Sequence, residues 1–138
     1  MLRTASFLAA AALLAAPFAA HAQPDHERVA ALQDAQRAAM AKLAAMDGAW
    51  RGTATTLLRG GERRTIVQTE RIGPFLGGTV KVIEGRGYDD AGGVAFNALG
   101  IVSYDPASSR YTLRSHAHGR AGDFAFEPTA DGYRWQVP

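Results

Sequence analysis

Apolar residues follow two different periods along the chain, and the period changes next to Trp50. In residues 24–46 the apolar side chains recur at alternating steps of three and four, which places them on one face of a helix. From Trp50 onward apolar and polar residues alternate, as in half-buried strands, and clusters of Gly, Pro, Asp and Ser interrupt the alternation at short intervals. The pattern predicts one helix followed by a series of short strands.

The predicted helical segment, residues 23–47, has an apolar stripe that ends at Leu43 and Met46. Asp25 suits the N-cap, and Gly48 lies just past the last turn, where glycine commonly ends a helix. The opposite face carries charges of both signs, which argues against a helix that lies on an anionic membrane surface. We therefore expect the helix to pack its stripe against the rest of the domain.

Seven strands are predicted, each bounded by turn-forming residues: 49–58, 63–72, 79–86, 94–104, 110–118, 123–127 and 133–137. Short links join them in sequence, which favours an antiparallel meander. Pro74, within the glycine-rich segment 73–78, is expected at a corner because proline cannot donate a hydrogen bond in the middle of a sheet. Since no second helix is predicted to cover it, the meander of residues 48–138 is expected to be an all-β domain that curls into an up-and-down barrel or partial barrel.

The predicted strands are fewer than a closed barrel of this kind needs. Such barrels close with about eight or ten strands, and an unclosed barrel leaves two unpaired edges. We therefore expect that the chain is truncated at its C-terminus. The alternative is a half-open sheet that a second chain completes.

The first 22 residues have the pattern of an export signal. Arg3 gives a positive start, residues 6–16 contain an apolar run, and Ala20-His21-Ala22 matches the site that signal peptidase cleaves. The run is shorter than the roughly 20 residues that span a membrane. We expect cleavage after Ala22 and a periplasmic or secreted protein, with a retained anchor as the alternative.

Composition excludes several functional classes. The chain has no cysteine, which rules out disulfides, thiol catalysis and cysteine metal sites. Its formal net charge is +2 and its arginines are spread along the sequence, whereas nucleic-acid-binding proteins concentrate positive charge on one face. The sequence has no nucleophile elbow, phosphate-binding loop or dinucleotide fingerprint. We therefore expect no nucleic-acid partner, no cofactor and no catalytic residues.

Two regions of the sequence resemble a known family. Gly48-Ala49-Trp50-Arg51-Gly52 resembles the first strand of calycin-type barrels, which include lipocalins and fatty-acid-binding proteins. Residues 111–124 and 131–135, with Gly100 and Tyr104-Asp105-Pro106, are similar to exported bacterial proteins that carry a lipocalin-like domain of unknown function. The resemblance covers residues 46–135 and implies a calycin-like barrel, but it implies no catalytic residues. Members of that family continue for further strands, in agreement with a truncated chain.

The favoured function is non-catalytic binding of an apolar or amphipathic small molecule. Such a cavity would be lined mainly by apolar side chains, and the candidate lining residues are Trp50, Phe75, Phe96, Tyr104 and Tyr111. For Trp50 we favour a competing interpretation, a core anchor whose ring N–H needs a single partner.

Arg114, His116 and His118 alternate on one side of a predicted strand. If that side faces the lumen, Arg114 would bind the head group of a carboxylate or phosphate ligand. If it faces water, the other side forms the core, with Tyr111, Leu113, Phe124, Phe126, Tyr133 and Trp135. Because the aromatic residues cluster on that other side, we favour the second arrangement.

His116 and His118 are also candidate metal ligands. Alternation places both imidazoles on one strand face, about 7 Å apart at the backbone, and Asp123 follows across the next turn as a source of an oxygen ligand. The pattern resembles the His-x-His motif of cupins, although the acid, the spacing and the flanking glycines differ. Metal or haem binding through these histidines is the alternative function, and a structural envelope domain is a third. For the histidines themselves we favour a solvent-facing pair beside arginines.

Glu70 and Glu84 are the best-placed carboxylates for acid–base chemistry, on two consecutive predicted strands. They show no spacing that is diagnostic of a catalytic pair. Alternation with Arg64, Arg71 and Arg86 predicts cross-strand ion pairs on a solvated face instead. The sequence leaves open the identity of the ligand, the oligomeric state and whether the barrel is hollow.

Overall fold

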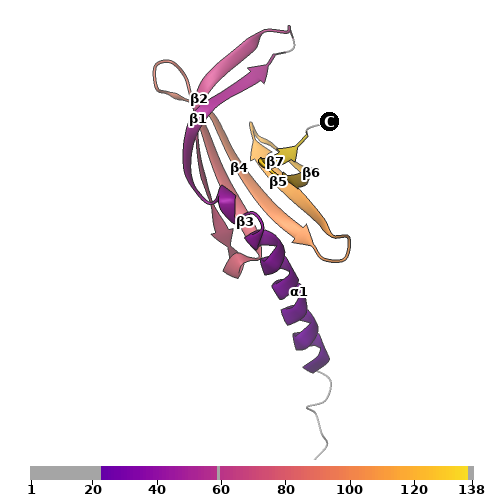
Figure 1. Ribbon diagram of the computed structural model, residues 1–138. Helices are drawn as coiled ribbons and strands as arrows, with labels where there is room; N and C mark the ends of the chain where they lie inside the picture. Colours follow the sequence, from indigo (N-terminus) through magenta and orange to yellow (C-terminus); the bar gives the residue numbers. More distant parts are fainter. Residues whose placement is uncertain (1–22, 59, 137–138) are drawn as a thin grey trace, which may run out of the picture.

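One antiparallel sheet of seven strands, in the order β1 to β7, makes up most of the protein (Figure 1). The computed structural model describes residues 23–58 and 60–136, so the predicted signal peptide lies outside the described residues. The sheet curls into a half-barrel, and the helix α1 lies at one end of it (Figure 1). The predicted all-β meander with one N-terminal helix is confirmed.

The described elements follow one another with short links. In chain order they are α1 (Gln23–Ala41), η1 (Ala44–Met46), β1 (Gly48–Leu57), β2 (Arg63–Phe75), η2 (Leu76–Gly78), β3 (Val80–Tyr88), β4 (Val94–Asp105), β5 (Arg110–Ala117), β6 (Arg120–Thr129) and β7 (Gly132–Trp135). Each strand pairs with the next, so β1 and β7 are the two ends of the strand order. Within the described ranges, no helix combines the length and the apolar character needed to cross a membrane.

Strand β2 is longer than predicted because it continues through Pro74 instead of ending at a corner. Pro74 lies opposite Lys81 of β3. Strand β1 no longer accompanies β2 at this point, since its last pair joins Gly48 to Ile72. A proline here therefore removes no hydrogen bond on that side of β2, and the chain turns only at η2.

The hairpin between β5 and β6 is tighter than predicted. Strand β5 ends at Ala117, which pairs with Arg120, the first residue of β6. The residues between them, His118 and Gly119, have φ angles of 51° and 71°. Two-residue hairpin turns favour positive φ at both positions, and glycine adopts it without strain. The turn predicted at residues 119–122 is wrong, and His118 belongs to the turn instead of the strand.

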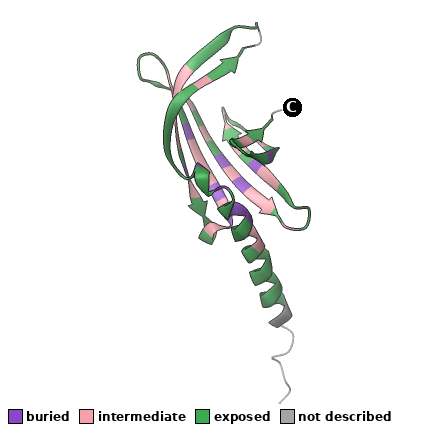
Figure 2. Ribbon diagram, in the orientation of Figure 1, coloured by how far each residue is buried: buried purple, intermediate pink, exposed green. Residues whose placement is uncertain are grey.

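Helix α1 ends at Ala41, earlier than predicted. The next backbone amides bond to carbonyls three residues earlier, at 3.2 and 3.0 Å, and this tightening turns Leu43 and Met46 onto the sheet, where both are buried. The start of the predicted stripe does not pack, because Val29 is 51% and Leu32 is 43% exposed. Figure 2 shows most of α1 in the colour of exposed residues. Only the C-terminal part of the stripe belongs to the core.

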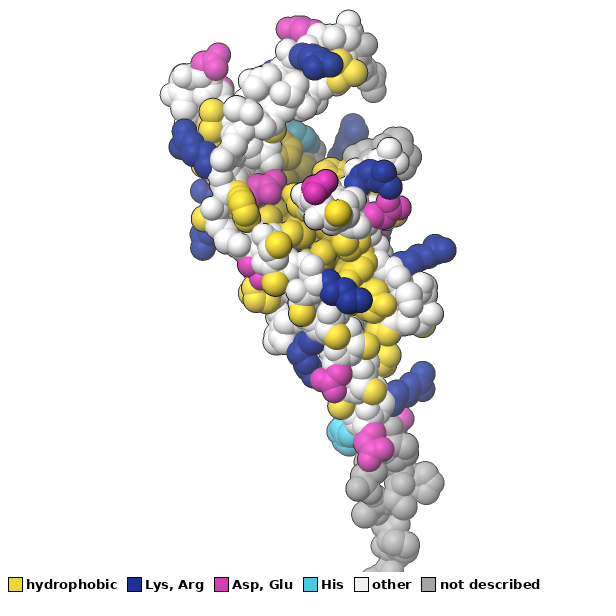
Figure 3. Space-filling model, viewed as in Figure 1, with side chains coloured by type: hydrophobic (Ala, Val, Ile, Leu, Met, Phe, Trp, Pro, Cys, Tyr) yellow, Lys and Arg dark blue, Asp and Glu magenta, His cyan; other side chains and the backbone are white. Residues whose placement is uncertain are grey.

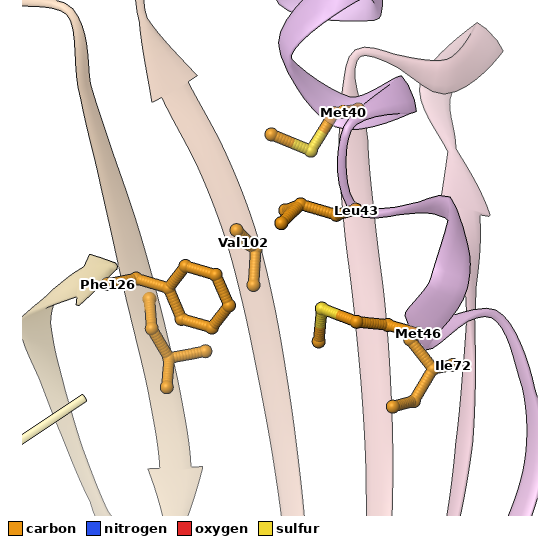
Figure 4. Packing of buried hydrophobic residues seen from close by; sticks show 7 residues of the cluster. Met40, Leu43, Met46, Ile72, Val102 and Phe126 are labelled. Atoms are coloured by element: carbon orange, nitrogen blue, oxygen red, sulfur yellow. The ribbon is translucent and has the colours of Figure 1, made fainter. Parts of the chain in front are cut away.

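The hydrophobic core lies between the end of α1, η1 and the inner face of the sheet (Figure 4). Its buried members are Met40, Leu43 and Met46 from the helical segment, and Ile72, Val102, Leu113 and Phe126 from the strands. Tyr111 adds a hydrogen bond, because its hydroxyl donates to the carbonyl of Ala39 at 3.0 Å. The core therefore occupies the end of the curled sheet that meets the helix.

An ion pair with one buried member lies beside this core. Lys81 of β3 is 1% exposed, and its ammonium bonds the carboxylate of Asp47, which precedes β1. A buried charge that lacks a partner is costly. The pair therefore fixes the link between η1 and β1 against β3.

Candidate ligand-binding groove

The inner face of the sheet changes in side-chain size from one end to the other. The strand register places Gly85, Ala98 and Ala117 side by side on β3, β4 and β5. Closer to the helix, the same face carries Val102 and Leu113, which pair directly and are both buried. Large side chains fill the space that small ones leave open. The inner face is therefore packed at one end and hollow at the other.

The hollow end is a groove of about 390 Å³. Its apolar walls come from β3 to β7 and include Ile83, Phe96, Leu113, Phe124, Tyr133 and Trp135. The rings of Phe124 and Trp135 pack together with their centroids 5.6 Å apart. Figure 3 shows apolar side chains gathered along the inner side of the curl, between the β1–β2 hairpin and the last strands. The size and the lining of the groove are typical of a small-molecule site.

The glycines that line the groove have two kinds of surroundings. A Cβ atom at Gly100 would lie 2.9 Å from the side chain of Leu113, and one at Gly122 would lie 2.8 Å from that of Phe124, so these neighbours already occupy the space. At Gly85, by contrast, a Cβ would meet nothing closer than 3.9 Å. Gly85 is therefore the position at which an added side chain would project into the open groove.

One end of the groove is polar. Glu70 of β2 lies opposite Gly85 in the β2–β3 register and is half-buried, and Gln68 donates to its Oε1 at 2.8 Å. The pKa of Tyr133, on β7, is raised by burial and, to a lesser extent, by the negative charge of Glu70. A carboxylate from β2 and a phenol from β7 thus face the same space.

A second cavity, of about 570 Å³, shares two lining residues with the groove, Glu70 and Tyr133. Its other walls include Met46, Trp50 of β1, and the turn between β6 and β7. It lies on the open side of the half-barrel, between the two ends of the strand order. Glu70 therefore borders both cavities.

Of the aromatic residues predicted to line a ligand cavity, Phe96 lines the groove. Tyr104 and Tyr111 pack on each other, with centroids 4.9 Å apart, and against the helix-covered core. Phe75 is 62% exposed near the end of β2. The structure therefore brings only one of these four residues into the groove.

Trp50 is not the core anchor that the sequence favoured. It is 52% exposed, because it lies on the outermost strand of the sheet. Its ring N–H donates to the carbonyl of Met46 at 2.7 Å, as the single partner such a ring needs. One side of Trp50 lines the second cavity, so its place as a ligand-lining residue stays a prediction.

The arrangement of faces favoured from the sequence is confirmed for β5. Leu113 is buried on the inner face, whereas Arg114 lies on the outer face and bonds both carboxylate oxygens of Asp123, at 3.0 and 2.8 Å. More than half of the Arg114 side chain is exposed. A head group bound in the groove would therefore not meet Arg114.

The two candidate metal-binding histidines do not share a face. His116 is on the outer face beside Glu84, whereas His118 packs its ring on Phe96, with centroids 5.3 Å apart. The strand alternation fails because the strand ends before His118, whose φ is positive. Asp123 is engaged in its ion pair. In residues 23–58 and 60–136, no group of three or more His, Cys, Asp and Glu side chains is placed to hold a metal.

The two candidate acid–base residues have different surroundings. Glu84 is on the outer face and pairs with Arg86 of its own strand at 2.6 Å and, across strands, with Arg71 at 3.8 Å, so the predicted cross-strand ion pair is confirmed for Glu84 with Arg71 alone. Glu70 is on the inner face, because the register sets Arg71 opposite Glu84 and Glu70 opposite Gly85. Gly85 and Glu84 are consecutive on β3 and therefore face opposite sides of the sheet, so Glu70 and Glu84 also lie on opposite faces.

Comparisons of the chain with protein-family models, with curated proteins and with solved structures find no match. The groove, its polar end and the second cavity are therefore the observations on which a proposal of function rests.

Proposed function

We propose that this protein is an exported, non-catalytic binding protein that holds an apolar or amphipathic small molecule on the inner face of its half-barrel. The observation that carries the proposal is the groove of about 390 Å³, with aromatic walls and small residues at its base. The likeness of residues 46–135 to lipocalin-like domains and the export-signal pattern of residues 1–22 support the same proposal.

Covering the groove provides the driving force for binding. Its walls include Phe124, which is half-buried, and Trp135, which is 41% exposed. Removing apolar surface from water contributes about 2.5 kcal/mol for every ~100 Å² covered. An apolar ligand that contacts both rings therefore gains affinity without needing a matching set of hydrogen bonds.

The test is a fluorescence titration of the purified protein with N-phenyl-1-naphthylamine, a neutral apolar dye that brightens when it leaves water. We expect saturable binding by the native chain. In Gly85→Leu the added side chain enters the open groove and should weaken binding by about tenfold or more, the factor that 1.4 kcal/mol of lost contact produces.

Gly73→Leu is the matched control. Gly73 also lies within a strand, also has open space where a Cβ would be added, and pairs with Val82, which lines a pocket on the outer face. Circular dichroism should show both variants folded, and Gly73→Leu should bind the dye like the native chain. Undiminished binding by a folded Gly85→Leu variant, or no saturable binding by the native chain, would contradict the proposal.

A further inference from the structure

The charged residues around the two cavities differ in how far they are buried. The groove is lined by Glu70 and Arg120, and the second cavity by Lys42, Glu70 and Asp131. Lys42, Arg120 and Asp131 are exposed, whereas Glu70 is half-buried and is the charged residue that lines both spaces. A ligand that fills the groove therefore meets one half-buried negative charge at the polar end of the groove.

Among the described carboxylates on the strands, Glu70 and Asp105 lack an ion pair, but Asp105 is exposed and bonds its own turn. Asp47, Glu84, Asp123 and Glu127 each lie within an ion pair with Lys or Arg. Within the described part of the chain, Glu70 has no such pair, and its hydrogen bond comes from the neutral amide of Gln68. A partly desolvated carboxylate is stabilised by a nearby positive charge. The groove is therefore electrostatically complementary to a cation.

Two aromatic residues line the same space as this carboxylate. Trp50 lies directly opposite Glu70 in the β1–β2 register, and Tyr133 lines both cavities with Glu70. The raised pKa of Tyr133 has the charge of Glu70 among its causes, which is consistent with their proximity. The faces of aromatic rings attract cations, most strongly those of Trp, and exclude water from them.

We infer that the ligand is an apolar molecule with a cationic head group, an amine or a quaternary ammonium, whose charge binds Glu70 between Trp50 and Tyr133 while its apolar part fills the groove. This inference rests on the proposed function and narrows its ligand class. An inward-facing Arg114 would have selected an anionic head group. Because Arg114 lies on the outer face and pairs with Asp123, the inferred head group is cationic instead.

The experiment compares three displacers of bound N-phenyl-1-naphthylamine that share a decyl chain: decyltrimethylammonium, undecanoate and decanol, each used below the concentration at which it forms micelles or separates from water. The native chain should release the dye to the ammonium compound at about tenfold lower concentration than to the carboxylate, since cation–π and charge attraction together supply about 1.4 kcal/mol or more. Decanol should fall between them.

Glu70→Gln removes the charge and retains the size of the side chain. This variant should still bind the dye, which also shows that it is folded. The ammonium compound and the carboxylate should then displace the dye from it at equal concentrations. Glu84→Gln is the matched control, because it removes an equal charge from the outer face. It should retain the native preference for the ammonium compound.

The outcomes separate the two proposals. Dye binding without a preference for the ammonium compound would overturn the cationic ligand and leave the groove as a binding site. A preference that persists in Glu70→Gln, or that is lost equally in Glu84→Gln, would also overturn it. Absence of dye binding by the native chain would overturn both. A preference for undecanoate that disappears in Arg120→Gln would assign the head group to Arg120 at the exposed part of the groove.

Discussion

The helix-covered end and the open end of the inner sheet face use the same strands but side chains of different size. On β6, Phe126 belongs to the covered end and is 3% exposed, whereas Phe124, two positions away on the same face, lines the groove and is half-buried. On β4, Val102 is fully buried and Ala98 borders the groove. The boundary between core and groove thus crosses individual strands.

The difference shows how a small domain without disulfides divides its apolar residues. At the covered end Met40, Leu43 and Met46 from the helical segment pack against the sheet, and Leu43 and Met46 also border the second cavity. The described helix extends away from the open end (Figure 1). The apolar walls of the open end therefore face the groove instead of a packing partner. Stability is therefore expected to come mainly from the covered end, and ligand binding from the open end.

The largest expected effect tests this division with two phenylalanines of one strand. Phe126→Ala should lower the free energy of unfolding by about 3–5 kcal/mol, because it leaves a cavity among Tyr111, Tyr133 and the helical side chains. Phe124→Ala should cost only about 1 kcal/mol, because its ring is half-buried beside the open groove. Urea unfolding followed by circular dichroism measures both. Equal losses would show that the open end is as important for stability as the covered end.

The ion pair between buried Lys81 and partly exposed Asp47 gives the next effect. Asp47→Asn leaves the ammonium of Lys81 buried without a negative partner and should cost about 3 kcal/mol, at the lower end for such pairs because Asp47 is partly exposed. Asp123→Asn breaks the exposed pair with Arg114 and should cost less than about 1 kcal/mol. The same unfolding assay compares them. A cost for Asp47→Asn as small as that for Asp123→Asn would mean that Lys81 finds water or another acceptor.

The fold was largely predictable because it depends on patterns that are local in the sequence. The change of period at Trp50 and the short links between strands were enough for a seven-strand meander behind a helix. The errors fall where a neighbouring strand decides the outcome. Pro74 stays in β2 because β1 has ended beside it, and His118 leaves β5 because a tight turn forms there.

The groove was much harder to predict, since it depends on register between strands. Gly85, Ala98 and Ala117 are distant in sequence and become neighbours only through two strand pairings. The sequence signal for the groove was the occurrence of small residues at alternate positions of consecutive strands. The prediction used aromatic residues alone and therefore selected Tyr104 and Tyr111, which pack against the core. Glu70 and Glu84 likewise look equivalent until the register places them on opposite faces.

A third prediction uses two glycines to locate the boundary between the two ends. Gly100→Ala should cost about 1–3 kcal/mol, because the new methyl group would press on Leu113, which is itself part of the packed core. Gly85→Ala should change the free energy of unfolding by less than about 0.5 kcal/mol, because the methyl group enters open space and the unfolded chain loses freedom. Thermal unfolding distinguishes them. A loss at Gly85 equal to that at Gly100 would place Gly85 inside the core.

The smallest effect concerns Tyr133, which belongs to both ends: its ring stacks on Phe126 at 5.2 Å, and it lines the groove with Glu70. Burial and the charge of Glu70 raise the pKa of Tyr133 above its ordinary value of 10.0. The folded protein therefore retains the phenolic proton at a pH where the unfolded chain releases it. This contribution to stability is complete below that ordinary value and is lost as the pH rises through the raised pKa.

Unfolding in urea at about pH 8 and about pH 11 should show a smaller loss of stability at alkaline pH for Tyr133→Phe than for the native chain, with Tyr111 still titrating in both. An equal loss in both proteins would mean that the phenol of Tyr133 is in contact with water on the groove side and that the boundary of the core runs between its ring and its hydroxyl.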